Sequence, residues 1–126
     1  MRAWLPVAVY AALILAVSSI PASRMPQSPT LWSFDKLLHA GEYFVLGALL
    51  ARALSLGPPR VDPVIAVAIS AIVCAAFGAV DEAYQSLTPG RSSSPWDAVA
   101  DAVGAAAGAL SAAWWFSRQG VDVDRA

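Results

Sequence analysis

The sequence predicts an all-α, polytopic membrane protein whose four transmembrane helices form an up-down-up-down bundle. Hydrophobic residues make up 58% of the 126-residue chain and charged residues only 13%, against roughly half and a quarter in a soluble domain. Four stretches are apolar enough and long enough to cross about 30 Å of hydrocarbon as helices. All five tryptophans lie near the ends of these stretches, as interfacial aromatic residues do. Four strands cannot close a barrel in lipid, so helices are predicted.

These four spans form what we interpret as one membrane domain over residues 1–126. The first span is uncharged, and the third carries charge only in its last turn. The expected spans are residues 4–20, 37–56, 63–85 and 97–116, followed by a short polar tail over residues 117–126. A cleaved signal peptide is the alternative for residues 1–23, because Arg2 precedes an apolar run that ends in small residues.

Helix-starting and helix-ending residues support these boundaries. Residues 57–59, Gly-Pro-Pro, end the second span. Asp62 and Ser94 are capping residues, each followed by proline at the first helical position. Asp97, three residues after Ser94, completes the pattern of a capping box. Residues 88–91, Thr-Pro-Gly-Arg, have proline second and glycine third, as a type II turn requires.

The basic residues favour an orientation with both termini in the cytoplasm. Cytoplasmic loops of membrane proteins carry more lysine and arginine than external ones. With the N-terminus inside, Arg2, Arg52, Arg60, Arg118 and Arg125 face the cytoplasm, and Arg24, Lys36 and Arg91 face outward.

Polar residues gather at the start of the second span, the end of the third, the following turn and the start of the fourth. In helices of alternating direction, these places meet at one membrane face. Ionisable groups at membrane depth usually face a cavity or pair with one another, so we predict a polar pocket there. Its candidate catalytic residues are His39 and Glu82. Its candidate ligand-binding residues are Asp35, Lys36, Glu42, Tyr43, Asp81, Gln85, Arg91, Asp97 and Asp101.

Some of these residues also have a structural interpretation. Asp35, Lys36 and Asp97 lie at helix ends, where charges can reach the interface or complement the helix dipole. Gly104 and Gly108 are spaced four apart, which indicates close helix packing.

Composition excludes several other classes of protein. The formal net charge of −1 gives no reason to expect a nucleic-acid partner. The single cysteine, Cys74, rules out an intrachain disulfide. His39 with several carboxylates offers metal ligands, but no HExxH-like spacing is present, so neither a metal nor a cofactor is expected.

Three motifs run along the last three spans. They are Asp35-Lys36-x-x-His39-x-x-x-Tyr43-x-x-x-Gly47, Asp81-Glu82-x-x-Gln85-x-x-x-Pro89-Gly90-Arg91 and Asp97-x-x-x-Asp101-x-x-Gly104-x-x-x-Gly108. With the four-span layout, they resemble the VanZ-like family of bacterial membrane proteins over about residues 30–110. Two positions depart from the family pattern: Leu87 stands where an aromatic residue is common, and Asp101 where asparagine is more common.

The resemblance implies a multi-pass protein of the bacterial cytoplasmic membrane with a role in the cell envelope. The founding member is associated with resistance to the glycopeptide teicoplanin. The expected partners are therefore membrane lipid and a cell-wall precursor or glycopeptide-related ligand, and a homo-oligomer is a further expectation.

Three functions are compatible with these sequence features. The first is a binding cavity in which Arg91 and Lys36 meet an anionic group of a cell-wall or lipid-linked ligand. The second is a membrane enzyme that acts on a lipid-linked precursor, with His39 as general acid or base. The third is a small proton-coupled carrier subunit, for which dimerisation through Gly104 and Gly108 would be needed.

Overall fold

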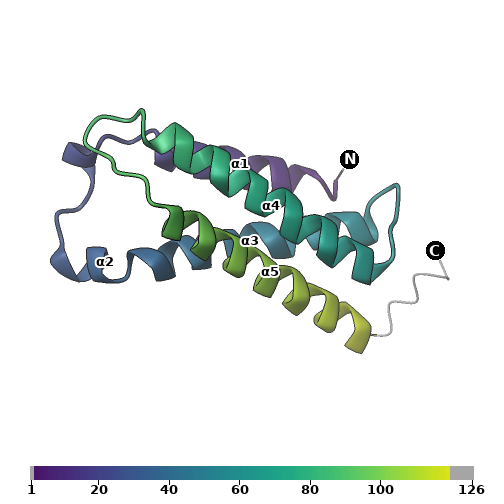
Figure 1. Ribbon diagram of the computed structural model, residues 1–126. Coiled ribbons are helices and arrows are strands. Elements are labelled where there is room, and N and C mark those ends of the chain that lie inside the picture. Colours follow the sequence, from purple (N-terminus) through teal and green to yellow (C-terminus); the bar gives the residue numbers. More distant parts are fainter. Residues whose placement is uncertain (1, 120–126) are drawn as a thin grey trace.

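The computed structural model describes residues 2–119, apart from the side chains of residues 31 and 32, and it contains no strand in that range. This confirms the all-α prediction. Two short helices lie in the connection that follows the first long one (Figure 1). The elements in chain order are α1 (Leu5–Ser18), η1 (Ala22–Arg24), α2 (Pro29–Ser33), α3 (Asp35–Leu56), α4 (Pro63–Gln85) and α5 (Pro95–Arg118).

Three of the helices are long and apolar enough to cross a membrane. They are α3, α4 and α5, with 22, 23 and 24 residues. A helix rises 1.5 Å per residue, so each is about 33–36 Å long, enough for a hydrocarbon core of about 30 Å. Helices α3 and α5 each begin two residues before the predicted spans, and α4 covers the same residues as the third span.

The first apolar helix is shorter than the predicted span of residues 4–20. Helix α1 has 14 residues, which corresponds to about 21 Å. Its end has a local cause: Pro21 disfavours the helical conformation of the residue before it. The hydroxyl of Ser19 also bonds back to the carbonyl of Leu15, at 2.7 Å. By length alone, α1 therefore falls below the other three helices as a candidate span.

The start of α4 and the turn before α5 have the predicted local geometry. Asp62 accepts hydrogen bonds from the backbone N–H groups of Val64 and Ile65, at 2.8 and 3.4 Å, as an N-cap does. In the turn, the N–H of Arg91 donates to the carbonyl of Thr88 at 3.1 Å, and Gly90 has a φ of 74°. A positive φ at the third position is what a type II turn requires.

The capping box predicted for α5 forms only in part. Ser94 caps the helix by accepting a hydrogen bond from the N–H of Trp96 at 3.2 Å. In a full box, Asp97 would bond back to the N–H of Ser94. Instead that N–H donates to Glu82 of α4, and Asp97 pairs with Lys36 of α3. The backbone N–H of Ser94 and the carboxylate of Asp97 thus both bond to other helices and not to each other.

Helices α3 and α5 pack so closely that their backbones touch at glycines. A Cβ atom on Gly104 would collide with the backbone carbonyl of Ala40, and one on Gly108 with that of Phe44. In return, a Cβ on Gly47 would collide with the carbonyl of Ala105. Small residues permit such approach between helices in lipid. Gly104 and Gly108 are buried within the chain, so they form no exposed face through which two copies could dimerise.

The interior holds few large apolar side chains, and many more lie on the outside. The core cluster is Ile14, Tyr43, Leu46, Leu50, Cys74 and Ala105. Exposed apolar residues occur along every long helix, as lipid contact requires. They include Leu5, Val9, Leu37, Val64, Ile72, Val103 and Leu110.

Connections and tryptophans divide between the two ends of the bundle. Figure 1 shows α2 and the α4–α5 connection at one end, and the α3–α4 connection at the other. Trp96 lies in the first turn of α5, whereas Trp114 and Trp115 lie near its C-terminal end. Of the residues used to predict orientation, Arg125 lies outside the described part of the chain, as do residues 120–126 of the predicted tail.

Candidate functional site

A buried serine ties α1 to α4 at the end of the bundle that holds the polar residues. The hydroxyl of Ser18 donates to Asp81 Oδ2 at 2.9 Å and accepts from Gln85 Nε2 at 3.2 Å. The backbone carbonyl of Ser18 accepts from the hydroxyl of Thr88 at 3.0 Å. All of these side chains are buried. The last turn of α1 is therefore fixed against the last turn of α4 and the residues that follow it.

An ion pair joins the starts of α3 and α5. Lys36 Nζ bonds to Asp97 Oδ1 and lies 3.5 Å from Asp35 Oδ2. Asp97 is buried, while the side chain of Lys36 is about half exposed. The charge of this lysine is thus matched by carboxylates of its own chain.

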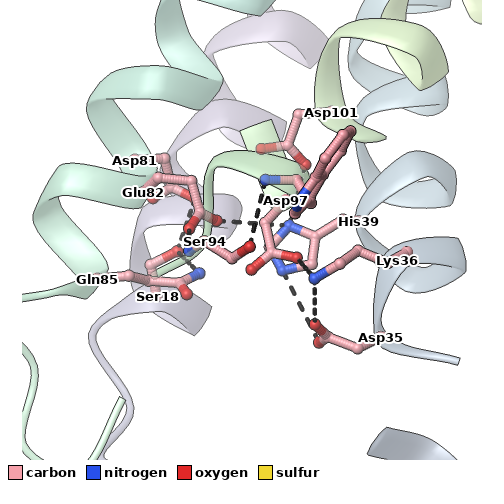
Figure 2. Close-up of polar contacts among 11 residues, drawn as sticks. Ser18, Asp35, Lys36, His39, Asp81, Glu82, Gln85, Ser94, Asp97 and Asp101 are labelled. Carbon is pink, nitrogen blue, oxygen red and sulfur yellow. Dashed lines mark hydrogen bonds and ion pairs between the residues drawn. The ribbon is translucent and has the colours of Figure 1, made fainter. Parts of the chain in front are cut away.

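His39 lies between acidic side chains from three helices (Figure 2). Its Nδ1 is 3.0 Å from Asp101 Oδ1 of α5 and 3.7 Å from Glu82 Oε1 of α4. Its Nε2 is 3.9 Å from Asp35 Oδ1, one turn earlier on α3. The imidazole therefore has one nitrogen directed toward buried carboxylates and the other toward a more exposed one.

Two further groups hold the acidic side chains in place. Glu82 Oε2 accepts a hydrogen bond from the backbone N–H of Ser94 at 3.2 Å, which joins α4 to the start of α5. Gly78 makes room for Asp101: a Cβ on Gly78 would lie 2.9 Å from Asp101 Cβ and 3.0 Å from its Oδ2. Any larger residue at that position would press on the carboxylate.

A polar cavity of about 170 Å³ opens beside these groups. Since a water molecule occupies about 30 Å³ of liquid, the space suits a small ionic group or a few waters. Residues from α3, α4, α5 and the α4–α5 connection line the cavity. They are Asp35, Lys36, His39, Gln85, Gly90, Arg91, Ser92, Ser94 and Asp97.

Several buried polar atoms at this end have no hydrogen-bond partner among the residues that the structure describes. They are Asp81 Oδ1, Glu82 Oε1, Asp101 Oδ2, Arg91 Nη1 and Tyr43 Oη. Unpaired buried polar atoms are uncommon, and each one left unpaired costs stability. Three of the five are carboxylate oxygens, which can accept hydrogen bonds or bind a cation, and one belongs to a guanidinium, which can donate to an anion.

The structure divides the predicted site residues into three groups. Asp35, Lys36, His39, Gln85, Arg91 and Asp97 line the cavity. Glu82 and Asp101 lie against the histidine of that lining. Glu42, Tyr43 and Asp81 are not part of the cavity lining: Asp81 bonds to Ser18, and the Tyr43 ring packs in the core, 6.2 Å from that of Phe77.

Three residues with clear roles were not among the predicted site residues. Ser18 joins α1 to the site, the backbone of Ser94 holds Glu82, and Gly78 accommodates Asp101. A signal existed for Ser18, because it begins a Ser-Ser pair at the end of an apolar run. Gly78 is an isolated glycine inside an apolar span, and such a glycine often marks close packing in membrane helices.

Two sets of three side chains place metal-ligating atoms near one another. The ligating atoms of each set all lie within 4.8 Å of one another. One set is Asp35, His39 and Asp97, and the other is His39, Glu82 and Asp101. The absence of an HExxH-like spacing therefore does not exclude a metal site, because the ligands come from different helices.

Comparison with known proteins identifies the family of this chain. A search of curated proteins finds no match, and a search of solved structures finds none either. A family model described as VanZ/LLP1 matches residues 4–116. The match includes all of α1, α3 and α4, α5 up to residue 116, and every residue of the polar site described above. The resemblance predicted from the three motifs is thereby confirmed, and the chain belongs to the VanZ/LLP1 family.

Proposed function

We propose that this protein is a multi-pass component of the bacterial cytoplasmic membrane whose polar cavity binds the anionic group of a cell-wall or lipid-linked envelope precursor. The four apolar helices cross the membrane in alternating directions, with α1 extended by the apolar residues on either side of it, and the end that carries the cavity faces outward. Both termini then lie in the cytoplasm. The excess of basic residues at the opposite end supports this orientation.

The main support for the proposal is the position of the Arg91 guanidinium. It lines the cavity, and its Nη1 is buried with no hydrogen-bond partner in the described range of residues. Arginine binds carboxylates and phosphates through two parallel hydrogen bonds. Lys36 is already paired with Asp97, whereas Arg91 has a donor in the cavity lining that can bond to an external anion.

The size of the cavity supports recognition of a head group and not of a whole precursor. A volume of about 170 Å³ accepts a phosphate or carboxylate with a few waters. The sugar, peptide or lipid portions would lie outside, along the exposed apolar helices. Glycopeptide tolerance, suggested by the family, would then follow from an altered supply or exposure of such a precursor.

A binding test follows from the charge of the ligand. Purified protein in detergent should unfold at a higher temperature with a polyprenyl phosphate than with the uncharged polyprenol, because a ligand that binds only the folded state stabilises it. Arg91→Lys should weaken this shift by removing the two-pronged contact, and Arg91→Gln should abolish it. Arg24→Lys, at an exposed arginine in η1, is the matched control and should behave as wild type.

The envelope role needs a separate readout in cells. Teicoplanin susceptibility, with vancomycin for comparison, should be measured in a deletion strain complemented at equal membrane levels. Wild-type protein and Arg24→Lys should restore tolerance, and Arg91→Gln should not. Equal tolerance with wild-type protein and both variants would refute the role of the cavity, and no effect of wild-type protein would refute the glycopeptide role for this chain.

A membrane enzyme is the second candidate, and one contact favours it. A hydrogen bond from His39 Nδ1 to buried Asp101 would fix the tautomer of the imidazole. Nε2 would then serve as general base or acid at the cavity. Turnover of a lipid-linked phosphate that His39→Gln abolishes, while the binding shift persists, would establish this function in place of simple binding.

A further inference from the structure

We propose that His39, Glu82 and Asp101 bind a divalent transition-metal cation, for which Zn²⁺ is the probe. The three ligands come from α3, α4 and α5, so the cation would join the three longest helices at one point. This inference does not depend on the proposed envelope role, because it concerns binding of the metal alone.

The spacing of the three side chains fits a small coordination sphere. Zinc bonds to histidine nitrogen and carboxylate oxygen are about 2.0–2.2 Å long, so neighbouring ligand atoms of a tetrahedral site lie about 3.3 Å apart. His39 Nδ1 is 3.0 Å from Asp101 Oδ1 and 3.7 Å from Glu82 Oε1. Small side-chain rotations would bring all three atoms to one cation.

A second observation distinguishes this set from an ordinary acidic cluster. Glu82 and Asp101 are only 5% and 0% exposed. Glu82 Oε1 is buried and has no hydrogen-bond partner within residues 2–119. Asp101 contacts the histidine through Oδ1, and its other oxygen, Oδ2, lies beside Gly78. A carboxylate oxygen such as Glu82 Oε1 costs stability unless it is protonated or meets a cation. Oε1 is also the Glu82 atom that faces the histidine.

The excess of acidic residues at this end of the bundle also supports a bound cation. Its acidic residues are Asp35, Glu42, Asp81, Glu82, Asp97 and Asp101, and its basic residues are Arg24, Lys36, His39 and Arg91. Carboxylates therefore outnumber basic groups six to four. Within a membrane span such an excess is expensive, and one divalent cation would offset the charges of Glu82 and Asp101.

The other set of three ligands is a weaker candidate. It shares His39 but uses Asp35 and Asp97, both of which lie beside the ammonium group of Lys36. A cation there would have to displace the lysine or accept its repulsion. The deeper set has no ammonium group beside it in the described part of the chain, so we assign the site to Glu82 and Asp101.

The donor set also limits the kind of metal. One imidazole suits zinc and other first-row transition metals more than magnesium or calcium, whereas carboxylates accept all of them. Three protein ligands leave a position for water or a ligand group, as in catalytic zinc sites. The cation would replace the proton on His39 Nδ1, so zinc affinity should fall as the pH is lowered.

The first experiment uses the full chain in detergent, stripped of metal with a chelator. Zinc titration by calorimetry should show one site per chain. X-ray absorption of the zinc-loaded wild type should show only nitrogen and oxygen ligands, including one imidazole, at about 2.0–2.1 Å. Sulfur in the coordination sphere would implicate Cys74 and overturn the assignment, and so would the absence of zinc uptake.

Variants then locate the site. Glu82→Gln and Asp101→Asn should each lower zinc affinity by at least about 10-fold, since loss of even an indirect partner of a metal ligand costs that much. Asp35→Asn removes a ligand of the competing set and should lower the affinity less than either of these changes, because in the deeper site Asp35 only lies near the second nitrogen of His39, at 3.9 Å. Asp62→Asn, at the other end of α4, is a second control because asparagine caps a helix as well as aspartate does.

The pattern of affinities decides between the two sets. A loss with Asp35→Asn and none with Glu82→Gln would overturn the proposal. If Glu82→Gln or Asp101→Asn does not fold, the absorption spectrum of wild-type protein compared with that of Asp35→Asn gives the answer: identical spectra support the deeper site, and loss of a ligand in Asp35→Asn refutes it.

Discussion

The close contact between α3 and α5 makes Gly104→Ala a severe change for so small a side chain. The added methyl group would meet the backbone carbonyl of Ala40, and a backbone atom cannot rotate away as a side chain does. Forcing extra atoms into a packed interface costs about 1–3 kcal/mol, occasionally more, and a backbone obstacle puts the cost near 3 kcal/mol. Alanine recovers about 1 kcal/mol over glycine in a helix interior.

The net expectation is a loss of about 2 kcal/mol in the free energy of unfolding, close to a 30-fold change in the ratio of folded to unfolded protein. Gly41→Ala is the matched control. It lies on α3, and a Cβ there would meet nothing within 4 Å. This variant has the same gain in helix propensity and no collision, so it should be neutral or up to about 1 kcal/mol more stable than wild type.

Unfolding of the purified protein by SDS in mixed micelles, followed by tryptophan fluorescence, measures both variants against wild type. The difference between them, about 3 kcal/mol, isolates the collision from helix propensity. Equal stability of Gly104→Ala and Gly41→Ala would refute the backbone contact. It would mean that α3 and α5 either lie further apart than described or separate at no cost.

Two other predictions concern the attachment of α1 and the orientation of the bundle. Ser18→Ala leaves the buried Asp81 carboxylate without its donor, so it should destabilise the protein by about 1–3 kcal/mol; Ser111→Ala, which loses only a bond within its own helix, should change stability far less in the same SDS titration. In a variant without the native cysteine, a cysteine introduced at exposed Ser92 should react with a membrane-impermeant maleimide in intact cells, whereas one at exposed Pro59 should react only after permeabilisation. The reverse labelling pattern would invert the proposed orientation.

Local features of the fold followed from short sequence patterns. The caps at Asp62 and Ser94 and the turn at residues 88–91 depend on neighbouring residues only, and the structure contains all three. The end of α1 was less predictable. The length of an apolar run does not determine the residue at which its helix ends. Here Ser19 and Pro21 end helix α1 before the apolar run ends.

The partners of the polar residues could not be predicted in the same way. Asp97 fits a capping box in sequence, yet in the structure it pairs with Lys36, 61 residues away. Tyr43 belongs to the same motif as His39, but it packs in the core and does not line the cavity. Helical spacing gives the face on which a residue lies, and the neighbouring helix determines what that face contacts.

The sequence by itself determined the helical class, the apolar surfaces, the family and the concentration of ionisable groups near particular helix ends. These properties depend on composition and on order along the chain. Only the tertiary structure decided which of those groups meet: it placed His39 between Glu82 and Asp101, tied Ser18 to Asp81, and let α3 and α5 touch at their glycines. The physical reason is that the rotation and depth of each helix are set by packing against the others, and a shift of one residue turns a helical side chain by about 100°.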